Sequence, residues 1–287
     1  MSTDPRTVAS LLALARSLGL ARLDAQLLVA HIVGRDRAWV IAHPEAVIAN
    51  AELVANAMRR CAAGEPLAYL VGRKAFHGLE LAVDQRVLIP RPETEILVEW
   101  ALELLDGPLA GLPHGRVLDL GTGSGAIALA LKIARPRIDV TAIDVSEAAI
   151  EVARTNAARL GLAVTFAGGD WWHALDGANP RPQFELIVAN PPYVREGDPH
   201  LASLSREPAA ALVSGRDGLD ALRTIVAGSS QYLSSRGWLL VEHGYDQADS
   251  VAGLMAAHGL RDIDRRVDLS GVLRCCGGRS PSSVDHL

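Results

Sequence analysis

The chain has 287 residues, of which 49% are hydrophobic and 21% charged, with a net charge of −5 and a pI near 6.0. This length allows one large domain, or one medium domain with a smaller companion. The mildly acidic balance argues against non-specific DNA binding, which relies on a basic face. Neither a secretory signal pattern nor a long uncharged apolar run is present, so we expect a soluble cytoplasmic protein.

The three cysteines, Cys61, Cys275 and Cys276, do not form a C-x-x-C pattern. An odd number without that spacing argues against a disulfide framework and against a structural zinc site, and no metal site is predicted. We interpret the adjacent Cys275 and Cys276 as two buried or half-buried thiols.

Residues 1–72 are expected to form a separate small helical domain. Apolar residues recur at helical spacing in two stretches, which include Leu11, Leu12, Ala15 and Leu18, and then Leu23, Leu27, Leu28 and Ile32. A third helix is predicted from Asn50 to about Ala63, where Gly64-Glu65-Pro66 ends it. No alternation of strand and helix occurs here, which indicates an independent unit.

Residues 73–91 are expected to form a β-hairpin linker. Phe76, Leu79, Leu81 and Val83 alternate as in a strand, and the turn is predicted at Asp84-Gln85. A helix should follow from Pro92 to Leu105, because proline suits the first helical turn and acidic side chains suit its positive end.

Residues 92–287 are expected to form an α/β catalytic domain. Strands are predicted at 117–120, 140–144, 164–167, 184–189 and 238–242, and helices at 126–135, 146–160, 219–233 and 247–257. This alternation predicts a mainly parallel sheet covered by helices on both faces. The last residues, from about 279 to 287, are predicted to be frayed.

A glycine-rich loop, D-L-G-T-G-S-G at 119–125, joins the first predicted strand to its helix. Glycines let the backbone approach a ligand closely, and the following helix offers unpaired N–H groups. The spacing also satisfies a loose dinucleotide fingerprint. However, an acid two residues before the first glycine is more typical of an S-adenosylmethionine loop, because a cationic cofactor tolerates a carboxylate better than a pyrophosphate does. Asp144, which ends the second strand, would bind ribose hydroxyls in either case.

Gly169-Asp170-Trp171-Trp172 follows the third predicted strand. In this class of sheet that position borders the adenine, so Asp170 is expected to accept from the adenine amine and Trp171 to pack against the ring. Trp172 is expected to be a packing residue.

Asn190-Pro191-Pro192-Tyr193 stands at the carboxyl end of a buried strand. The side-chain oxygen of Asn190 and the carbonyl of Pro191 can accept the two hydrogens of a planar NH₂ group, and the prolines preset that carbonyl. Tyr193 offers an aromatic wall. We therefore predict Asn190, Pro191 and Tyr193 as catalytic residues, with Pro192 joining them in binding the substrate. The pattern does not distinguish a glutamine amide from a nucleobase amine as the substrate group.

Several further stretches make the chain resemble the protein-(glutamine-N5) methyltransferases that modify peptide chain release factors. They are R-L-D-A at 22–25, E-P-L-A-Y-L at 65–70, L-I-P-R-P-E-T-E at 88–95, the glycine loop, N-P-P-Y-V at 190–194, E-P at 207–208, A-L at 211–212 and D-G-L at 217–219. The resemblance covers nearly the whole chain. It implies a Rossmann-like S-adenosylmethionine-dependent methyltransferase sheet with a helical N-terminal domain joined by a β-hairpin.

The resemblance also implies a substrate, the glutamine of the Gly-Gly-Gln motif in class I release factors, and a monomer that binds neither nucleic acid nor membrane. S-adenosylmethionine, which leaves as S-adenosylhomocysteine, is expected to contact Gly121, Thr122, Gly123, Ser124, Gly125, Asp144, Asp170, Trp171 and Asn190. The helical domain would dock the release factor. Arg91 and Glu93 either line the cleft or cap the following helix.

Two other functions remain open from the residues alone. One is an RNA or DNA methyltransferase acting on the exocyclic amine of a base, although the acidic balance and the lack of a long basic insert speak against duplex DNA. The other is a cofactor-binding scaffold without chemistry, which the intact Asn190 to Tyr193 motif disfavours.

Overall fold

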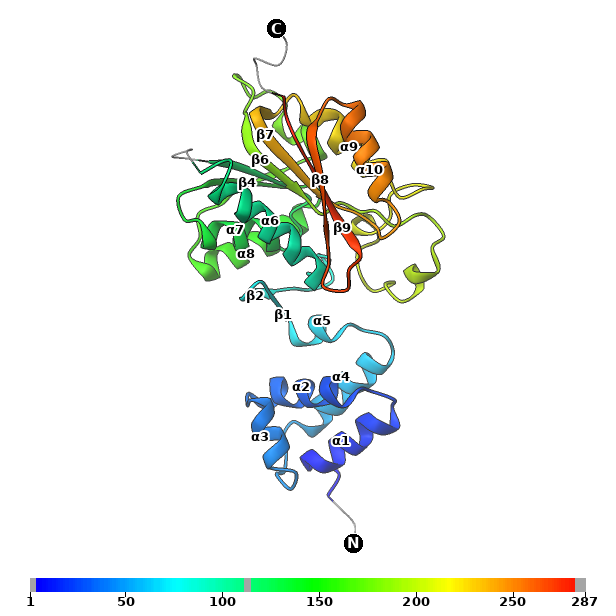
Figure 1. Ribbon diagram of the computed structural model, residues 1–287. Coiled ribbons are helices and arrows are strands. Elements are labelled where there is room, and N and C mark those ends of the chain that lie inside the picture. The colour runs from blue at the N-terminus through cyan, green and yellow to red at the C-terminus, as the bar shows by residue number, and fades with distance from the viewer. Residues whose placement is uncertain (1–3, 111–114, 282–287) are drawn as a thin grey trace. The chain divides into compact units, whose positions relative to one another are not determined.

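The computed structural model describes residues 4–110 and 115–281, and the chain divides after Arg73 into two compact units (Figure 1). Across these described ranges, no helix has the length and apolar character needed to cross a membrane.

The first unit is helical, with α1 (Val8–Ser17), α2 (Arg22–Val33), α3 (Arg37–Ala42), α4 (Ala51–Ala62) and α5 (Leu67–Val71). Thr7 caps α1 by accepting from the Ser10 N–H, and Gly34 ends α2 in the left-handed conformation. The unit has its own core, which includes Val8, Leu11, Leu28, Val54 and Met58. The short helices α3 and α5 were not predicted, because five or six residues give too little periodicity to recognise.

A two-stranded hairpin follows, formed by β1 (Arg73–Phe76) and β2 (Leu79–Ala82). The hairpin is confirmed, but its predicted turn at Asp84-Gln85 is wrong. The turn lies at His77-Gly78, where both residues have positive φ angles of 45° and 75°, as a tight two-residue hairpin requires. Asp84 instead accepts from the backbone and side chain of Arg86 in a local turn after β2.

The second unit contains a seven-stranded sheet in the order β5-β4-β3-β6-β7-β9-β8. Its strands are β3 (Arg116–Leu120), β4 (Asp139–Asp144), β5 (Thr165–Gly168), β6 (Phe184–Ala189), β7 (Leu233–Glu242), β8 (Arg261–Val267) and β9 (Leu273–Arg279). The pairs from β5 through β7 are parallel, and β9 runs antiparallel to both β7 and β8. The predicted Rossmann-like, mainly parallel sheet is thus confirmed.

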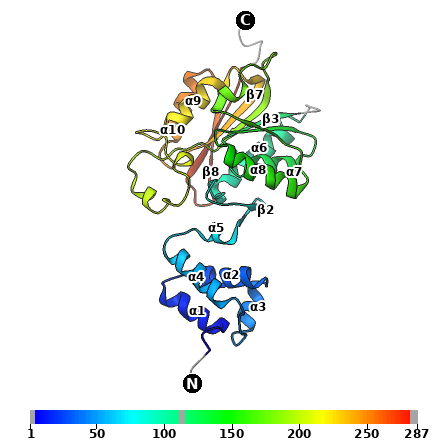
Figure 2. The same ribbon diagram turned by 180° about the vertical axis from the view of Figure 1, so that it is seen from behind.

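Helices cover both faces of this sheet, with α6, α7 and α8 on one side and α9 and α10 on the other (Figures 1 and 2). They are α6 (Glu95–Asp106), which follows a 3₁₀ turn over Pro92–Thr94, α7 (Ala126–Ala134), α8 (Glu147–Leu160), α9 (Asp220–Ser229) and α10 (Ala248–Ala257). Successive strand residues alternate between the two cores, so Val117 faces α6 and α7 while Leu118 faces α9 and α10.

The C-terminal part of the sheet differs from the sequence prediction. The helix expected to reach Leu233 ends at Ser229, because Leu233 already pairs with Phe184 in the sheet. Strand β8 was not predicted, and β9 runs through Cys275 and Cys276 and ends at Arg279. The fraying predicted from about 279 to 287 falls mostly on 282–287, which lie outside the described residues. The two thiols are fully buried on opposite faces of the sheet, and burial raises the pKa of Cys276 to about 11.

Candidate active site

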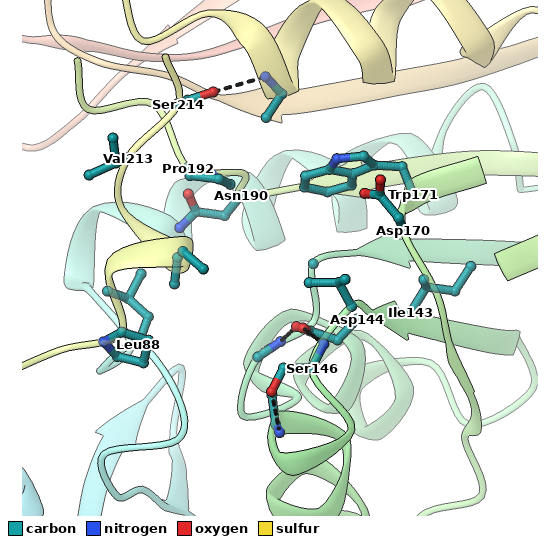
Figure 3. A pocket seen from close by; sticks show the side chains of 18 of the residues that line it. Leu88, Ile143, Asp144, Ser146, Asp170, Trp171, Asn190, Pro192, Val213 and Ser214 are labelled. Atoms are coloured by element: carbon teal, nitrogen blue, oxygen red, sulfur yellow. Dashed lines mark hydrogen bonds between the residues drawn. The ribbon is translucent and has the colours of Figure 1, made fainter. Parts of the chain in front are cut away.

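A pocket of about 500 Å³ lies at the carboxyl ends of the parallel strands in the second unit (Figure 3). In open α/β sheets this edge is where ligands bind. Seven of the predicted residues line the pocket together, namely Gly121, Gly123, Asp144, Asp170, Trp171, Asn190 and Pro192. The remaining predicted residues do not line it; they are Thr122, Ser124, Gly125, Pro191 and Tyr193.

The glycine loop is fixed to the end of the neighbouring strand. The Gly123 N–H donates to Asp144 Oδ2 at 2.8 Å, and the Ser146 N–H donates to Asp144 Oδ1 at 2.9 Å. Burial raises the pKa of Asp144, and these two bonds oppose the shift. Gly121 has a φ of 74°, and a Cβ there would come within 3.4 Å of the Trp171 ring. The positive φ therefore favours glycine at this position, and the indole packs directly against it.

Asp119, the acid before the loop, does not face the pocket. Its side chain is fully buried and accepts at Oδ2 from the Thr122 hydroxyl at 2.7 Å and from the Ala128 N–H at 3.2 Å. Burial raises its pKa to about 7, although both hydrogen bonds lower it. The sequence argument that this carboxylate tolerates a nearby cationic ligand is therefore replaced by a structural role, since Asp119 holds the loop to the start of α7.

Trp171 and Trp172 have different surroundings. Trp171 lines the pocket beside Asp170 (Figure 3). Trp172 stacks on Tyr232 at 4.8 Å between ring centroids and donates its indole N–H to the Thr224 carbonyl. The interpretation of Trp172 as a packing residue is confirmed.

Asn190 is oriented by a residue from a distant segment. Its Nδ2 donates to Thr94 Oγ1 at 2.9 Å, and Thr94 is buried at the end of the 3₁₀ turn before α6. The Asn190 Oδ1 accepts no hydrogen bond from the described residues, so this atom can accept from a ligand. The Pro191 carbonyl likewise has no donor within residues 4–110 and 115–281. Neither expected acceptor is thus taken by a donor from these residues, and of the two only Asn190 lines the pocket.

A buried carboxylate, Glu242, lies at the end of β7 behind this motif. The Tyr193 hydroxyl donates to Glu242 Oε1 at 3.0 Å. Burial raises the pKa of Glu242 to about 7, although interactions with the Thr94 and Tyr193 hydroxyls lower it. Burial and the adjacent carboxylate raise the pKa of Tyr193 as well, so its hydroxyl stays protonated as a donor.

The chain beyond Tyr193 forms a further wall of the pocket. Val194 N–H donates to the Leu212 carbonyl at 2.8 Å, and the Gln247 side chain donates to the Tyr193 carbonyl at 3.0 Å. Pro208, Ala210, Ala211, Val213 and Ser214 line the pocket from this segment. Arg91 is paired with the buried Glu207 at 2.5 Å, which also accepts from the Ile89 N–H. Arg91 therefore ties two segments together and does not line the pocket.

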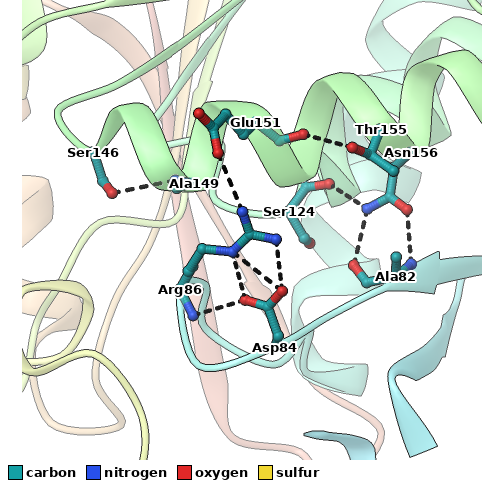
Figure 4. Close-up of polar contacts among 9 residues, drawn as sticks. All are labelled: Ala82, Asp84, Arg86, Ser124, Ser146, Ala149, Glu151, Thr155 and Asn156. Carbon is teal, nitrogen blue, oxygen red and sulfur yellow. Dashed lines mark hydrogen bonds and ion pairs between the residues drawn. The ribbon is translucent and has the colours of Figure 1, made fainter.

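Asn156 joins the loop to the hairpin segment (Figure 4). Its Nδ2 donates to the carbonyls of Ala82 and Ser124, each at 3.0 Å, and its Oδ1 accepts from the Ala82 N–H at 2.7 Å. Next to it, Arg86 on the pocket rim pairs with Asp84 and with Glu151. Asn156 was missed because nothing in a helical run of polar residues marks one of them as buried.

Thr94, Gln247 and Glu242 were also absent from the predicted site. Thr94 belongs to a stretch that carried the resemblance, but no local pattern assigned it a role. Glu242 had a usable signal, since an acid follows the apolar run W-L-L-V at 238–241, as Asp144 follows the apolar end of the second strand.

Comparison with known proteins agrees with this site. Residues 98–215 match the methyltransferase small domain, and residues 6–72 match the PrmC N-terminal domain. A methyltransferase from Pyrococcus furiosus aligns with a TM-score of 0.51 at 16% identity, covering 79% of this chain and 98% of that one. A 16S rRNA methyltransferase from T. thermophilus, solved with AdoMet and guanosine, aligns with a TM-score of 0.52 at 20% identity, covering 72% and 49%. The fold and the site define an S-adenosylmethionine-dependent methyltransferase.

Similar proteins of known family show which group of methyltransferases this chain belongs to. The release factor glutamine methyltransferase of Burkholderia pseudomallei is 46% identical over 97% of this chain and 98% of its own length. That of Bordetella pertussis is also 46% identical, over 91% and 95%. The chain belongs to the release factor glutamine methyltransferase family. This membership decides against the base methyltransferase and the inactive scaffold that the sequence left open.

Proposed function

We propose that this chain transfers a methyl group from S-adenosyl-L-methionine to the side-chain amide nitrogen, N5, of the glutamine in the Gly-Gly-Gln motif of class I release factors, with S-adenosyl-L-homocysteine as the product. The orientation of the Asn190 amide supports placing the substrate amide here. Its Nδ2 donates to Thr94 Oγ1, so its Oδ1 is free to accept a hydrogen bond from the substrate. Family membership supplies the substrate class. We expect the enzyme to act in the cytoplasm as a monomer, without nucleic acid or membrane as a partner.

The pocket suits the cofactor by size and by chemistry. Its volume of about 500 Å³ falls within the range of small-molecule sites. Gly121 and Gly123 line the pocket with backbone that a ligand can approach closely. Asp144 would accept from the ribose hydroxyls, and Asp170 with Trp171 would border the adenine. When bound, the cofactor supplies a methyl group on a positively charged sulfur. Asn190 would border both this group and the substrate.

The substrate amide needs help because its nitrogen lone pair is delocalised into the carbonyl. Two acceptors, Asn190 Oδ1 and the Pro191 carbonyl, would hold both N–H bonds and aim the nitrogen, and the two prolines keep that carbonyl in place. Tyr193 would pack against the flat amide, with its hydroxyl fixed by Glu242. Neutral acceptors suffice because the N–H protons become acidic as positive charge develops on nitrogen.

We further propose that the helical unit docks the release factor. Leu23 and Leu27 stand one turn apart on α2 and are exposed, Leu23 by 50%, and exposed apolar side chains at i and i+4 share one helix face. Leu23→Asp should raise the KM for the release factor and leave S-adenosylmethionine binding unchanged. An unchanged KM would remove this face from the docking surface.

The direct test uses labelled S-adenosylmethionine with the purified chain and either a release factor or the same factor with its Gly-Gly-Gln glutamine replaced by alanine. Label should appear only on the unmodified factor. Label on RNA and on neither protein would refute the proposal. Asn190→Ala should abolish transfer while cofactor affinity, measured by calorimetry, falls only modestly. Equal loss of both would make Asn190 mainly a cofactor ligand.

A further inference from the structure

The segment 194–215 follows the Asn190 to Tyr193 motif and forms one wall of the pocket. Four of its residues line the pocket, namely Pro208, Ala210, Ala211 and Val213. The segment is closed at its neck, where Val194 and Val213 form a parallel bridge. Val213 lies on the Asn190 side of the pocket, across from Trp171 (Figure 3). This wall therefore borders the end of the pocket at which we place the substrate amide.

Glu207 attaches this segment to the rest of the catalytic unit. It is the one buried residue between 195 and 210, all of which the structure describes. Glu207 Oε1 accepts from the Arg91 guanidinium at 2.5 Å, and Oε2 accepts from the Ile89 N–H at 3.1 Å. Within the described part of the chain, every hydrogen bond or ion pair that links 195–211 to a residue outside 194–215 is made by Glu207. The segment is thus held at its neck and at one further point.

The partners of Glu207 belong to a second wall of the pocket. Ile89 and Arg91 directly follow Arg86, Val87 and Leu88, which line the pocket. Burying a carboxylate is costly unless its partners compensate for the lost water. A hydrogen-bonded carboxylate also fixes distance and direction, which an apolar contact does not. The choice of an acid at this position therefore sets the spacing between two walls and does not merely cover them.

We propose that Glu207 is a positioning residue that holds the wall at 208–213 against the segment 86–91 and so encloses the substrate end of the pocket. This inference rests on the proposed placement of the glutamine amide beside Asn190. Without the attachment, the chain between the neck residues could move away from the pocket and admit water around the amide. The transfer step should suffer most, because it depends on how closely the reacting groups are held.

Kinetics of three variants test this role. Glu207→Gln keeps the side-chain shape but places an N–H group among donors, and Arg91→Gln removes the charged partner. Each should lower kcat for release-factor methylation by about tenfold or more, with a much smaller change in the calorimetric affinity for S-adenosylmethionine. Arg91→Lys keeps a cation for Glu207 and should recover most of the kcat lost in Arg91→Gln.

Limited trypsin digestion reports the attachment itself. Arg206 is exposed and directly precedes Glu207, and Arg91→Gln leaves the sequence around this cleavage site unchanged. Cleavage after Arg206 under native conditions follows the population of the open segment. It should be about tenfold faster in Arg91→Gln than in the wild type, if the lost ion pair shifts this local equilibrium by one factor of ten.

Glu185→Gln is the matched control. Glu185 also accepts from a backbone N–H and an arginine side chain, both of Arg116, but at the opposite end of β6 from Asn190. The same change there should leave kcat and cleavage after Arg206 unaltered. The inference would be overturned if Glu207→Gln had the kcat of this control. A parallel loss of kcat, cofactor affinity and stability in urea would also overturn it, because Glu207 would then be purely structural. If the wild type methylated no release factor, the proposed function would be refuted, and the trypsin result would still decide whether Glu207 holds the segment.

Discussion

Replacing Asn156 with alanine should destabilise the catalytic unit and loosen its cofactor loop together. Asn156 is 1% exposed and makes three hydrogen bonds, to both backbone groups of Ala82 and to the Ser124 carbonyl (Figure 4). Its loss leaves these backbone groups without their partner, at about 1–3 kcal/mol for each one that water cannot reach. Ala82 is half-buried, so water can reach its backbone groups in part. We therefore expect the free energy of unfolding to fall by about 2–4 kcal/mol in total.

Urea unfolding of the full chain measures this loss, and calorimetry measures the affinity for S-adenosylmethionine. Because the Ser124 carbonyl belongs to the glycine loop, the cofactor affinity should weaken as well. Thr155→Ala is the matched control on the same helix. The Thr155 hydroxyl donates only to the Glu151 carbonyl, one turn earlier on the helix, at an exposed site. The free energy of unfolding should therefore change by about 0.5 kcal/mol or less. An Asn156→Ala variant as stable as this control would show that the three bonds contribute nothing net and refute the reasoning.

Three further outcomes are expected. Gly218→Ala should lower both stability and kcat, since φ is 78° and a Cβ would lie 2.3 Å from the Tyr193 carbonyl; wild-type kcat would contradict this. Trp171→Ala should weaken S-adenosylmethionine binding about tenfold by removing an aromatic wall, which calorimetry would detect. Burial raises the pKa of Glu242 from 4.5 to about 7. This group should therefore lower the stability of the wild type by about 3 kcal/mol as the pH rises through that range, because the carboxyl ionises in the unfolded chain while the buried one stays protonated. Buried Asp119 adds a decline of its own, so in urea unfolding at pH 5 and 8 Glu242→Gln should show a smaller decline than the wild type, by about 3 kcal/mol.

The sequence predicted the elements whose signals are local. The glycine loop, Asp144 and Asn190 each follow a strand directly, and strand ends of a parallel sheet meet at one edge, so their convergence on one pocket could be expected. The hairpin turn was misplaced because Asp84-Gln85 has residue types that favour a turn. The observed turn contains His77 with a positive φ, which its residue type does not predict.

The residues that orient the site could not be predicted in this way. Thr94, Glu242 and Gln247 reach the Asn190 to Tyr193 motif from segments about 50 to 100 positions away, and their roles depend on tertiary packing. Local patterns report which strand ends carry polar groups. They do not report which buried partner fixes the direction of a side-chain amide.

Asp119 and Glu242 use the same chemistry on two sides of the pocket. Each is a fully buried acid that accepts from a hydroxyl, that of Thr122 in the glycine loop for Asp119 and that of Tyr193 for Glu242. Both depend on a carboxylate that only accepts, and burial raises the pKa of each to about 7. The charged or titratable groups facing them are Asp144 for Asp119, and Glu93, Tyr193, Arg274 and Cys275 for Glu242.

Because the raised pKa values leave both acids protonated at lower pH, acidification below about pH 7 should remove both constraints. A protonated Glu242 is a weaker acceptor for the Tyr193 hydroxyl, so the ring proposed to pack against the substrate amide is held less firmly and kcat should fall. A protonated Asp119 can leave Thr122 without its acceptor, so cofactor affinity should fall over the same range. In Glu242→Gln kcat should no longer depend on pH through position 242, while the pH dependence of cofactor affinity should persist. If the variant lost the pH dependence of cofactor affinity as well, the two acids would form one coupled system and not two independent supports.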